Sequence, residues 1–453
     1  MKKIWLVILL LTGGAGVVWA AAEQEEFKPL EFRGKPFFMI GNWDARMEKN
    51  VRAVHPFLKA AGMNSVMLSI NFNDEKQYAE DLSVIRWFRD NQSDVAVIID
   101  LQLPFVLKEI GSKKWVPVPA EELPARREKF ARTLQELRSY GNVLGYSIDE
   151  LENRLHGTLG EWRKTVNPDQ EEMDTALARY MEVAVQWVTA EIKTAHPEAL
   201  FMPVQAWWTT YDKSDKLYDV LIANEYPVTG DQKQKQTYYT VAYDAQQAAA
   251  ATRKYHKRCF AYCPPGFNVL ATGAWKDARE YTREEIRYLW FTPISFGAMG
   301  IMGWRQRRAT PEFSENVLFP VMNEIKALTP WLLGEHLDRA VGCSRDSDIT
   351  EYKVRKRSRM TDNEDNEFNI RPVKTITWIA RRNPTDGSVL LLVCNNSYQP
   401  EQFFFTFSKP VNATYALELF SNQAIDLGGR FKVELKPYDV KAFILPDAGR
   451  MRN

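Results

Sequence analysis

Acidic side chains follow two short apolar runs of this sequence at positions where they could act on the same bond. Asp149 and Glu150 come directly after the run 142–148, and Glu225 lies near the end of the run 218–226. Two carboxyl groups can hydrolyse a glycosidic bond, because one protonates the leaving oxygen while the other attacks the anomeric carbon or activates water. These three acids are therefore our candidates for a catalytic set.

The ends of the other apolar runs carry side chains that suit sugar binding. Aromatic rings stack on the faces of pyranose rings, and amides and acids bind hydroxyl groups. The candidates for substrate binding are Trp43, Asp44, Asn71, Asp100, Gln205, Trp207, Tyr226, Tyr262, Trp304 and Arg305. Arg305 begins a basic stretch that would suit an acidic or sulfated sugar, because a guanidinium fork matches those groups.

Each candidate also has an ordinary structural explanation. The two adjacent acids could cap the following helix, since acids favour helix N-termini. Glu225 could pair with Lys213 or Lys216, and the basic stretch could be a solvated loop. Neighbours on a strand point to opposite faces, so one of Trp207 and Trp208 is expected to pack in the core.

The apolar runs alternate with amphipathic stretches of helical periodicity. Runs without internal alternation are typical of strands that are covered on both faces. The runs lie at residues 37–43, 65–71, 95–101, 142–148, 200–208, 218–226, 258–264 and 298–304. Strand and helix in repeated alternation predict an α/β fold, a (β/α)8 TIM barrel, whose active site lies at the carboxyl ends of the strands. The segment between the fifth and sixth runs is too short for a good helix, so either this crossover is degenerate or one strand lies elsewhere in the sequence.

The two ends of the chain differ from the barrel pattern. Short strand-like runs separated by turn residues follow residue 336, and they predict an all-β antiparallel sandwich. The start has Lys2 and Lys3, an apolar core and small residues at 20–22, which is typical of a signal peptide. We therefore predict a signal peptide at residues 1–22, a barrel at 23–335 and a sandwich at 336–453, with export to the periplasm or the medium.

Composition and motifs narrow the function classes. Lys and Arg number 59 against 58 Asp and Glu, so no charge excess favours a nucleic-acid partner. No P-loop, GxGxxG or HExxH motif occurs, and we expect no cofactor and no metal. The four cysteines are expected to be structural or free thiols. We expect no membrane span once the signal is removed, and the oligomeric state stays open.

Three segments together resemble known enzymes. EFRGKPFFMIGNW, NVLGYSIDELEN and REEIRYLWFTPISFGAMGIMGW are similar to glycoside hydrolases of the (β/α)8 superfamily, and residues 377–445 resemble the β-sandwich that often follows such barrels. In the large retaining clan of that superfamily an Asn-Glu pair ends the fourth strand, and its Glu is the acid/base. The resemblance therefore implies that role for Glu150, with Asp149 in the place of the Asn.

The clan's nucleophile is a Glu at the end of the seventh strand, where this chain reads CFAYCPPGF. That stretch holds no carboxylate, and Glu225 is the nearest substitute. On a regular strand only one of the two adjacent acids faces the site; we expect it to be Glu150, with Asp149 bracing a neighbouring loop or helix end. The predicted function is hydrolysis of a poly- or oligosaccharide, with retention or inversion left open. The alternatives are a carbohydrate-binding barrel without catalysis, and a different barrel chemistry or a structural role at the cell surface.

Overall fold

The structure is a computed structural model of the 453-residue chain. It describes residues 26–43, 55–101, 106–108, 115–150, 175, 185–206, 211, 217–227, 238–269, 279–304, 309–357, 364–408, 413–427 and 430–446. The predicted signal peptide lies outside the described residues.

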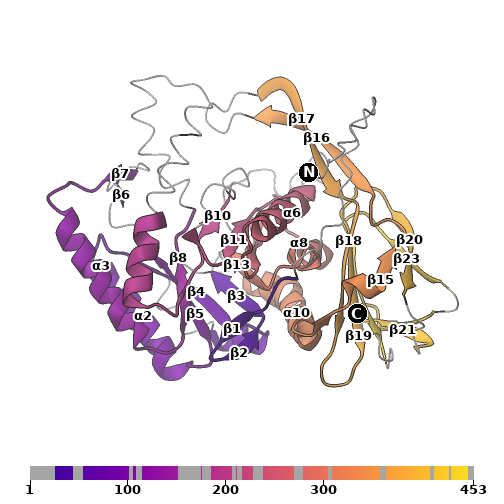
Figure 1. Ribbon diagram of the computed structural model, residues 1–453, viewed down its shortest axis with the longest axis horizontal. Coiled ribbons are helices and arrows are strands. Elements are labelled where there is room, and N and C mark those ends of the chain that lie inside the picture. The colour runs from indigo at the N-terminus through magenta and orange to yellow at the C-terminus, as the bar shows by residue number, and fades with distance from the viewer. Residues whose placement is uncertain are drawn as a thin grey trace, which may run out of the picture.

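A nine-stranded parallel sheet forms the centre of the first part of the chain (Figure 1). Its strands are β3 (Met39–Trp43), β4 (Ser65–Ile70), β5 (Ala96–Leu101), β8 (Val143–Ser147), β9 (Leu200–Phe201), β10 (Val204–Gln205), β11 (Leu221–Asn224), β12 (Phe260–Cys263) and β13 (Gly300–Trp304). Each of the predicted apolar runs contains one of these strands, and the fifth run contains two. The strand order is β10-β11-β12-β13-β3-β4-β5-β8-β9.

The two outermost strands of this order are halves of one run, so the sheet closes on itself. β9 and β10 are separated only by Met202 and Pro203. The Met202 N–H donates to the Tyr146 carbonyl at 2.7 Å on one side, and the Ile222 N–H donates to the Pro203 carbonyl at 3.0 Å on the other. Proline has no N–H to donate to a ladder, which explains the break inside the run. The predicted (β/α)8 barrel is confirmed.

Helices cover the outside of the barrel. Among them are α2 (Glu75–Asn91), α3 (Leu123–Arg138), α6 (Tyr239–Lys254), α8 (Arg283–Ser295), α9 (Pro311–Phe313) and α10 (Phe319–Leu332), with a π-helical turn at Ser314–Leu318 between the last two. Residues 55–60 and 185–195 are helical as well. Local sequence sets several of their starts. Asp74 accepts a hydrogen bond from the Gln77 N–H at the start of α2, and Thr282 and Glu285 form a capping box at the start of α8.

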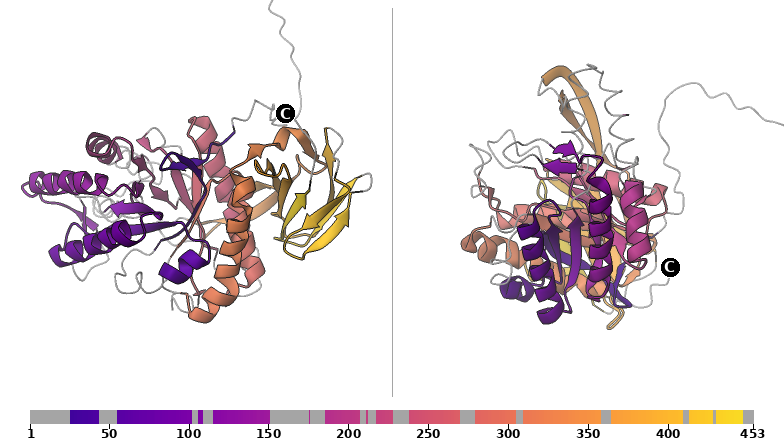
Figure 2. Two further views of the ribbon diagram at one scale, coloured as in Figure 1. Left: turned by 90° about the horizontal axis from the view of Figure 1, so that it is seen from below. Right: turned by 90° about the vertical axis from the view of Figure 1, so that its left-hand side faces the viewer.

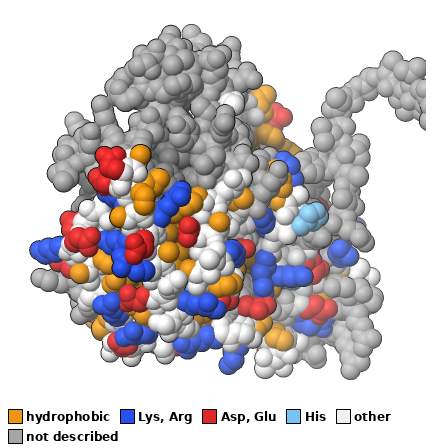
Figure 3. Space-filling model, turned by 60° about the vertical axis from the view of Figure 1, so that its left-hand side comes forward, with side chains coloured by type: hydrophobic (Ala, Val, Ile, Leu, Met, Phe, Trp, Pro, Cys, Tyr) orange, Lys and Arg blue, Asp and Glu red, His pale blue; other side chains and the backbone are white. Residues whose placement is uncertain are grey.

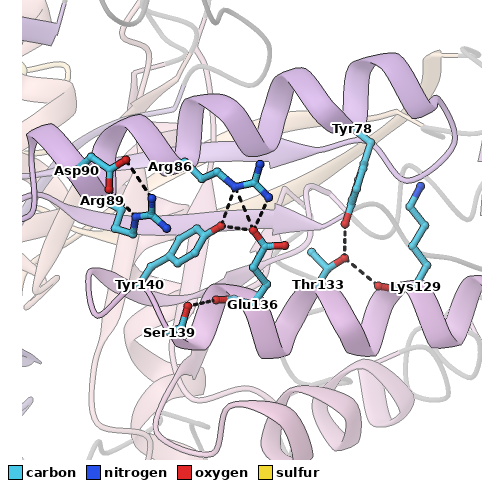
Figure 4. Close-up of polar contacts among 9 residues, drawn as sticks. All are labelled: Tyr78, Arg86, Arg89, Asp90, Lys129, Thr133, Glu136, Ser139 and Tyr140. Carbon is cyan, nitrogen blue, oxygen red and sulfur yellow. Dashed lines mark hydrogen bonds and ion pairs between the residues drawn. The ribbon is translucent and has the colours of Figure 1, made fainter.

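Polar contacts join α2 to α3 on the outer surface (Figure 4). The Arg86 guanidinium donates to Glu136 at 2.6 Å and to the Tyr140 hydroxyl at 3.2 Å. Further along the same pair of helices, the Tyr78 and Thr133 hydroxyls are 2.7 Å apart. Positive and negative side chains are interspersed on the face that Figure 3 shows, as the balanced composition leads one to expect.

The last part of the chain is an antiparallel β-sandwich, as predicted (Figure 2). Its strands are β14 (Glu335–His336), β15 (Val341–Cys343), β18 (Ile376–Arg382), β19 (Val389–Asn395), β20 (Glu401–Phe407), β21 (Tyr415–Glu418), β22 (Gln423–Asp426), β23 (Phe431–Leu435) and β24 (Val440–Leu445). The order β14-β18-β19-β24-β21-β22 forms one sheet, and β15-β20-β23 forms the other. Phe403, Phe405 and Phe431 fill the space between the two sheets.

Alternation along β19 explains how the sandwich joins the barrel. Leu391 and Val393 face the sandwich core, whereas Leu390, Leu392 and Cys394 belong to the same apolar cluster as the barrel helices. At β19 both faces of the larger sheet are therefore buried, one against the smaller sheet and one against the barrel. The two parts share a continuous hydrophobic boundary.

Three two-stranded hairpins lie outside these sheets. They are β1 (Leu30–Phe32) with β2 (Lys35–Phe37), β6 (Val106–Lys108) with β7 (Trp115–Pro117), and β16 (Ile349–Arg357) with β17 (Glu364–Lys374). The β6–β7 hairpin follows barrel strand β5 and so marks the carboxyl end of the barrel. Figures 1 and 2 both show the β16–β17 hairpin projecting toward that same end.

All four cysteines lie in the described part of the chain, and each is a free thiol, as predicted. In that part, no helix combines the length and apolar character that crossing a bilayer would require.

Candidate functional site

Aromatic side chains line the inner surface of the barrel at its carboxyl end. A Cβ on Gly303 would lie 2.7 Å from Trp290 of α8, so position 303 faces the helices and Trp304 faces the interior. The rings of Trp304 and its register partner Trp43 are 6.3 Å apart. Tyr226 stacks on Trp304 with centroids 4.4 Å apart and an angle of 12° between the planes.

Phe267 completes this group with edge contacts to both stacked rings, at 6.0 Å from Tyr226 and 5.5 Å from Trp304. We call Trp43, Tyr226, Phe267 and Trp304 the aromatic wall. Its members come from β3, β13 and the segments that follow β11 and β12. Three of the predicted sugar-binding residues are therefore brought together.

The Glu150 carboxylate lies next to the aromatic wall. Asn224, the last residue of β11, donates from Nδ2 to Glu150 Oε1 at 2.9 Å. The Tyr226 hydroxyl lies 3.5 Å from Cys263 Sγ. Burial raises the pKa of Tyr226 well above its usual value, and the nearby Cys263, Glu150 and Asp149 raise it further.

The two adjacent acids share one environment. Burial raises the pKa of the Cys263 thiol, and the negative charges of both Asp149 and Glu150 add to that shift. Strand alternation would have separated these neighbours, but β8 ends at Ser147 and Glu150 has a φ of 38°. This left-handed conformation is rare for a residue with a side chain, and such outliers gather at functional sites.

Asp100 fixes the start of this irregular segment. Its Oδ1 accepts the Asp149 backbone N–H at 2.9 Å, and its Oδ2 accepts the Ser69 hydroxyl at 2.7 Å. Asp100 is 2% exposed, so both oxygens lie in a protected environment. It was predicted to bind substrate; the contacts shown are those of a residue that positions the chain before Glu150.

Glu225 follows β11, and its charge acts on a second group of residues, one of which, Tyr281, also packs edge-on against Phe267 of the aromatic wall with ring centroids 6.4 Å apart. Burial raises the pKa values of Tyr239, Tyr262 and Tyr281, and the negative charge of Glu225 raises each of them further. We call these three residues the tyrosine cluster. Asn224 points inward to Glu150, and the next residue along the strand points outward, as alternation requires. Asn224, rather than Glu225, contacts Glu150.

Two predicted sugar-binding residues also lie on this outer side. Tyr262 has 0% exposure, and the charge of Asp244 on α6 is among the causes that raise its pKa after burial. Tyr211 donates its hydroxyl to Asp244 Oδ1 at 2.7 Å and lies 3.3 Å from the Gln205 carbonyl oxygen. Gln205, Ala223 and Tyr262 are register partners one position before the inward-facing Asn224 and Cys263, so the side chains of Gln205 and Tyr262 face outward, toward α6.

The remaining predictions fall on local turns or outside the described residues. Asn71 Oδ1 accepts the Asn73 N–H at 2.9 Å, which forms a tight turn after β4. Asp44, Trp207 and Arg305 lie outside the described residues.

The sequence prediction missed Asn224, Cys263 and Phe267 as members of the site. Side chains alternate along a strand, so a prediction that Tyr226 faces the site also implies that Asn224, two residues earlier, faces it. Among the described residues, no group of three or more His, Cys, Asp or Glu side chains is placed to hold a metal ion.

Comparison with known proteins gives a fold and no family. No protein-family model matches the chain, and no curated protein sequence matches it. Among solved structures, it is similar to an alpha-amylase from Geobacillus thermoleovorans complexed with acarbose. That match has a TM-score of 0.51 and 11% identity, and it covers 91% of this chain and 98% of the amylase.

A second similar structure is CelM2, a bifunctional glucanase-xylanase from a metagenome library. Its TM-score is 0.50 at 10% identity, over 93% of this chain and 97% of CelM2. The chain shares its fold with glycoside hydrolases. The prediction of a barrel followed by a sandwich, made from the apolar runs and their turns, is confirmed, and the resemblance to that superfamily holds at the level of the fold.

Proposed function

We propose that this protein is an exported glycoside hydrolase that uses Glu150 to protonate the leaving oxygen of a glycosidic bond. The observation that carries the proposal is the position of Glu150, held by Asn224 beside the aromatic wall at the carboxyl end of the barrel. Tyr226 and Trp304 are the partly exposed members of the wall, and aromatic rings beside a carboxyl group suit the binding and cleavage of a pyranoside.

The reaction proceeds by transfer of one proton and addition of one water. The Glu150 carboxylic acid gives its proton to the glycosidic oxygen as the bond to the anomeric carbon breaks. Positive charge then develops on the sugar ring, where a nearby carboxylate stabilises it. Water adds its oxygen to the anomeric carbon, and its proton returns to a carboxylate, so that the enzyme is restored.

Asp149 is the first candidate for the second carboxylate. It shares the environment of Tyr226 and Cys263 with Glu150, as the effects on both pKa values indicate. Glu225, predicted for this role from the sequence, lies beside the tyrosine cluster and is the second candidate. A separation of about 5–5.5 Å between the two carboxyl groups would give retention, and about 6.5–9.5 Å would give inversion.

A carbohydrate-binding barrel without catalysis is the alternative function. The observation that favours it is the identity of the residues that end β11 and β12, Asn224 and Cys263, neither of which is a carboxylate. Asn224 faces Glu150 where the sequence prediction has Glu225, and the fully buried Cys263 ends the strand on which the retaining clan carries its nucleophile. Binding of a sugar by the aromatic wall needs no second carboxylate.

Glu150→Gln separates the two functions, because the amide keeps the size of the side chain but has no acidic proton to transfer. Hydrolysis of a panel of polysaccharides and nitrophenyl glycosides should be lost, while binding of the same glycans persists. Glu434→Gln, which changes an exposed acid on β23 of the sandwich, is the matched control and should be unaffected. A wild-type protein that binds glycans and cleaves none across the panel would establish the binding function instead.

Export is part of the proposal and rests on the sequence of residues 1–22. Cleavage after this segment would release a periplasmic or secreted protein. Amino-terminal sequencing of the mature protein tests this directly, since an intact Met1 in the exported fraction would contradict it. The proposal also includes an acidic or sulfated sugar as substrate, because the basic stretch that begins at Arg305 would suit such groups.

A further inference from the structure

The β16–β17 hairpin leaves the sandwich and packs along helix α6 of the barrel. Tyr352 of β16 stacks on Tyr239, the first residue of α6, with centroids 4.1 Å apart and planes at 12°. Val373 of β17 is fully buried in the same cluster. Gln246 Nε2 donates to the Pro372 carbonyl at 3.1 Å.

These contacts fix the direction in which the hairpin runs. Gln246 is two turns into α6 and contacts residues 372 and 374, whereas Tyr239 at the start of α6 contacts residue 352, the register partner of Arg371. Because α6 follows β11, its first turn lies at the carboxyl end of the barrel. From Arg371, β17 extends back to Glu364, which is about 23 Å at about 3.3 Å per residue. The hairpin therefore passes beyond the barrel edge on which the candidate site lies (Figure 1).

Arg371 lies where the hairpin crosses this edge. Its guanidinium carbon is 5.3 Å from the centre of the Tyr243 ring, within range of a cation–π contact. Burial raises the pKa of Tyr239, the positive charge of Arg371 opposes that shift, and the charge of Glu225 adds to it. Tyr239 thus lies close to both Arg371 and Glu225.

The described residues contain no ion pair between Arg371 and a carboxylate. Other arginines with low exposure do have such partners, as in the pairs Arg381–Asp338 and Arg287–Glu324, both with contacts under 3 Å. Arg371 is partly buried and oriented by two tyrosines. An arginine held in this way keeps a planar fork of donors that suits a carboxylate or a sulfate.

We propose that the β16–β17 hairpin borders the substrate site beyond the aromatic wall, at the rim where α6 begins, and that Arg371 determines specificity by binding the anionic substituent of an acidic sugar that extends across this rim. This inference rests on the proposed function of the barrel. It assigns to the sandwich a direct part in recognition, from a strand more than 140 positions after Glu225 in the chain. A uronic acid and a sulfated sugar offer the same chemistry, and the test distinguishes them.

The test measures binding in the Glu150→Gln background, so that no ligand is consumed. The probes are hexagalacturonate, a heparin hexasaccharide, cellohexaose and maltohexaose, each titrated by calorimetry. We expect binding of one of the two acidic probes. Arg371→Met should weaken it about 10- to 100-fold, the usual effect of losing a hydrogen bond to a charged group. Affinity for neutral probes should change less than about twofold.

Lys353→Met is the matched control, because it removes the same charge from an exposed position on the opposite face of the same hairpin. It should leave all affinities within about twofold. Arg371→Lys guards against a folding defect and should retain the melting temperature while losing part of the acidic-probe affinity, since it keeps the charge but not the fork.

Three outcomes would overturn the inference. Equal loss of acidic and neutral binding in Arg371→Met would mean that the residue acts through packing alone. Binding of neutral probes only, with normal hydrolysis by the wild type, would leave the proposed function intact and refute Arg371 as a specificity residue. Absence of all glycan binding and cleavage would refute the function itself.

Discussion

The ends of β8 and β11 carry the acids predicted for catalysis, but they present them in different ways. After β8 the chain leaves the extended conformation, and Glu150 adopts a positive φ. The charges of Asp149 and Glu150 both raise the pKa values of Tyr226 and Cys263, so the two acids share one environment. After β11 the alternation continues, so that Asn224 faces inward and Glu225 faces the tyrosine cluster.

This difference teaches where a pattern of alternation can be trusted. A regular strand end sends neighbouring side chains to opposite faces, and it can supply only one of them to a site. A strand end with a left-handed residue can supply two neighbours to one site, at the cost of about 1–3 kcal/mol of backbone strain. Such a conformation persists only where its surroundings hold it, here through Asp100 and Asn224.

The largest expected difference between the two ends is in hydrolysis. Glu150→Gln should lower kcat/KM about 1,000-fold, within the range for removal of a general acid. Glu225→Gln should lower it less than about 10-fold, because the charge of Glu225 acts on the tyrosine cluster. Both variants are measured with the same glycoside under saturating and limiting conditions.

The reverse order would break this comparison. If Glu225→Gln also lost 1,000-fold, with an unchanged melting temperature, Glu225 would be the second catalytic carboxylate, as the sequence alone predicts. The outer position of its side chain in this structure would then have to change when substrate binds.

A second test concerns Asp149, whose backbone and side chain have separable roles. Asp149→Asn keeps the backbone N–H that donates to Asp100 but removes the charge. If Asp149 is the second carboxylate, kcat/KM should fall about 100-fold. A fall of less than about fivefold would instead support the brace predicted from the sequence. Asp90→Asn on α2, an exposed acid far along the chain, is the control.

Sequence patterns were sufficient for most of the fold. Every barrel strand falls within a predicted apolar run, because parallel strands covered on both faces must be apolar over their whole length. The division of the fifth run follows from Pro203, which was visible in the sequence. The runs after residue 336 are short and separated by turn residues, and this pattern was sufficient to predict the antiparallel sandwich.

The site was less predictable because it depends on backbone detail and on long-range packing. Nothing in the residue type of Glu150 indicates a positive φ, since glycine and asparagine are the usual occupants. The position of Arg371 depends on how the sandwich packs on α6, which no local pattern encodes. Trp43, Tyr226 and Trp304 could be grouped correctly because all three end predicted strands.

The aromatic wall should affect binding more than chemistry. Trp304→Ala removes the ring on which Tyr226 stacks, and we expect KM to rise about 10-fold while kcat stays within about threefold. Trp304→Phe keeps an aromatic face and should recover most of the loss. A fall in kcat alone would show that the ring acts on the position of Glu150 rather than on the sugar.

The smallest expected effects come from two variants that each remove one hydroxyl oxygen, one on the inner side of the barrel strands and one on the outer side. Tyr226→Phe removes an inner hydroxyl beside Glu150 and Cys263, and kcat/KM should fall about fivefold because a polar group at the site is lost. Tyr262→Phe removes an outer hydroxyl near Asp244, and kcat/KM should stay within about twofold. The free energy of unfolding, measured with denaturant, should also stay within about 1 kcal/mol, because the Tyr262 hydroxyl is buried without a hydrogen-bond partner among the described residues. Equal kinetic effects of the two variants would mean that the inner and outer groups act as one network across β11 and β12, and that Glu225 is coupled to the site through it.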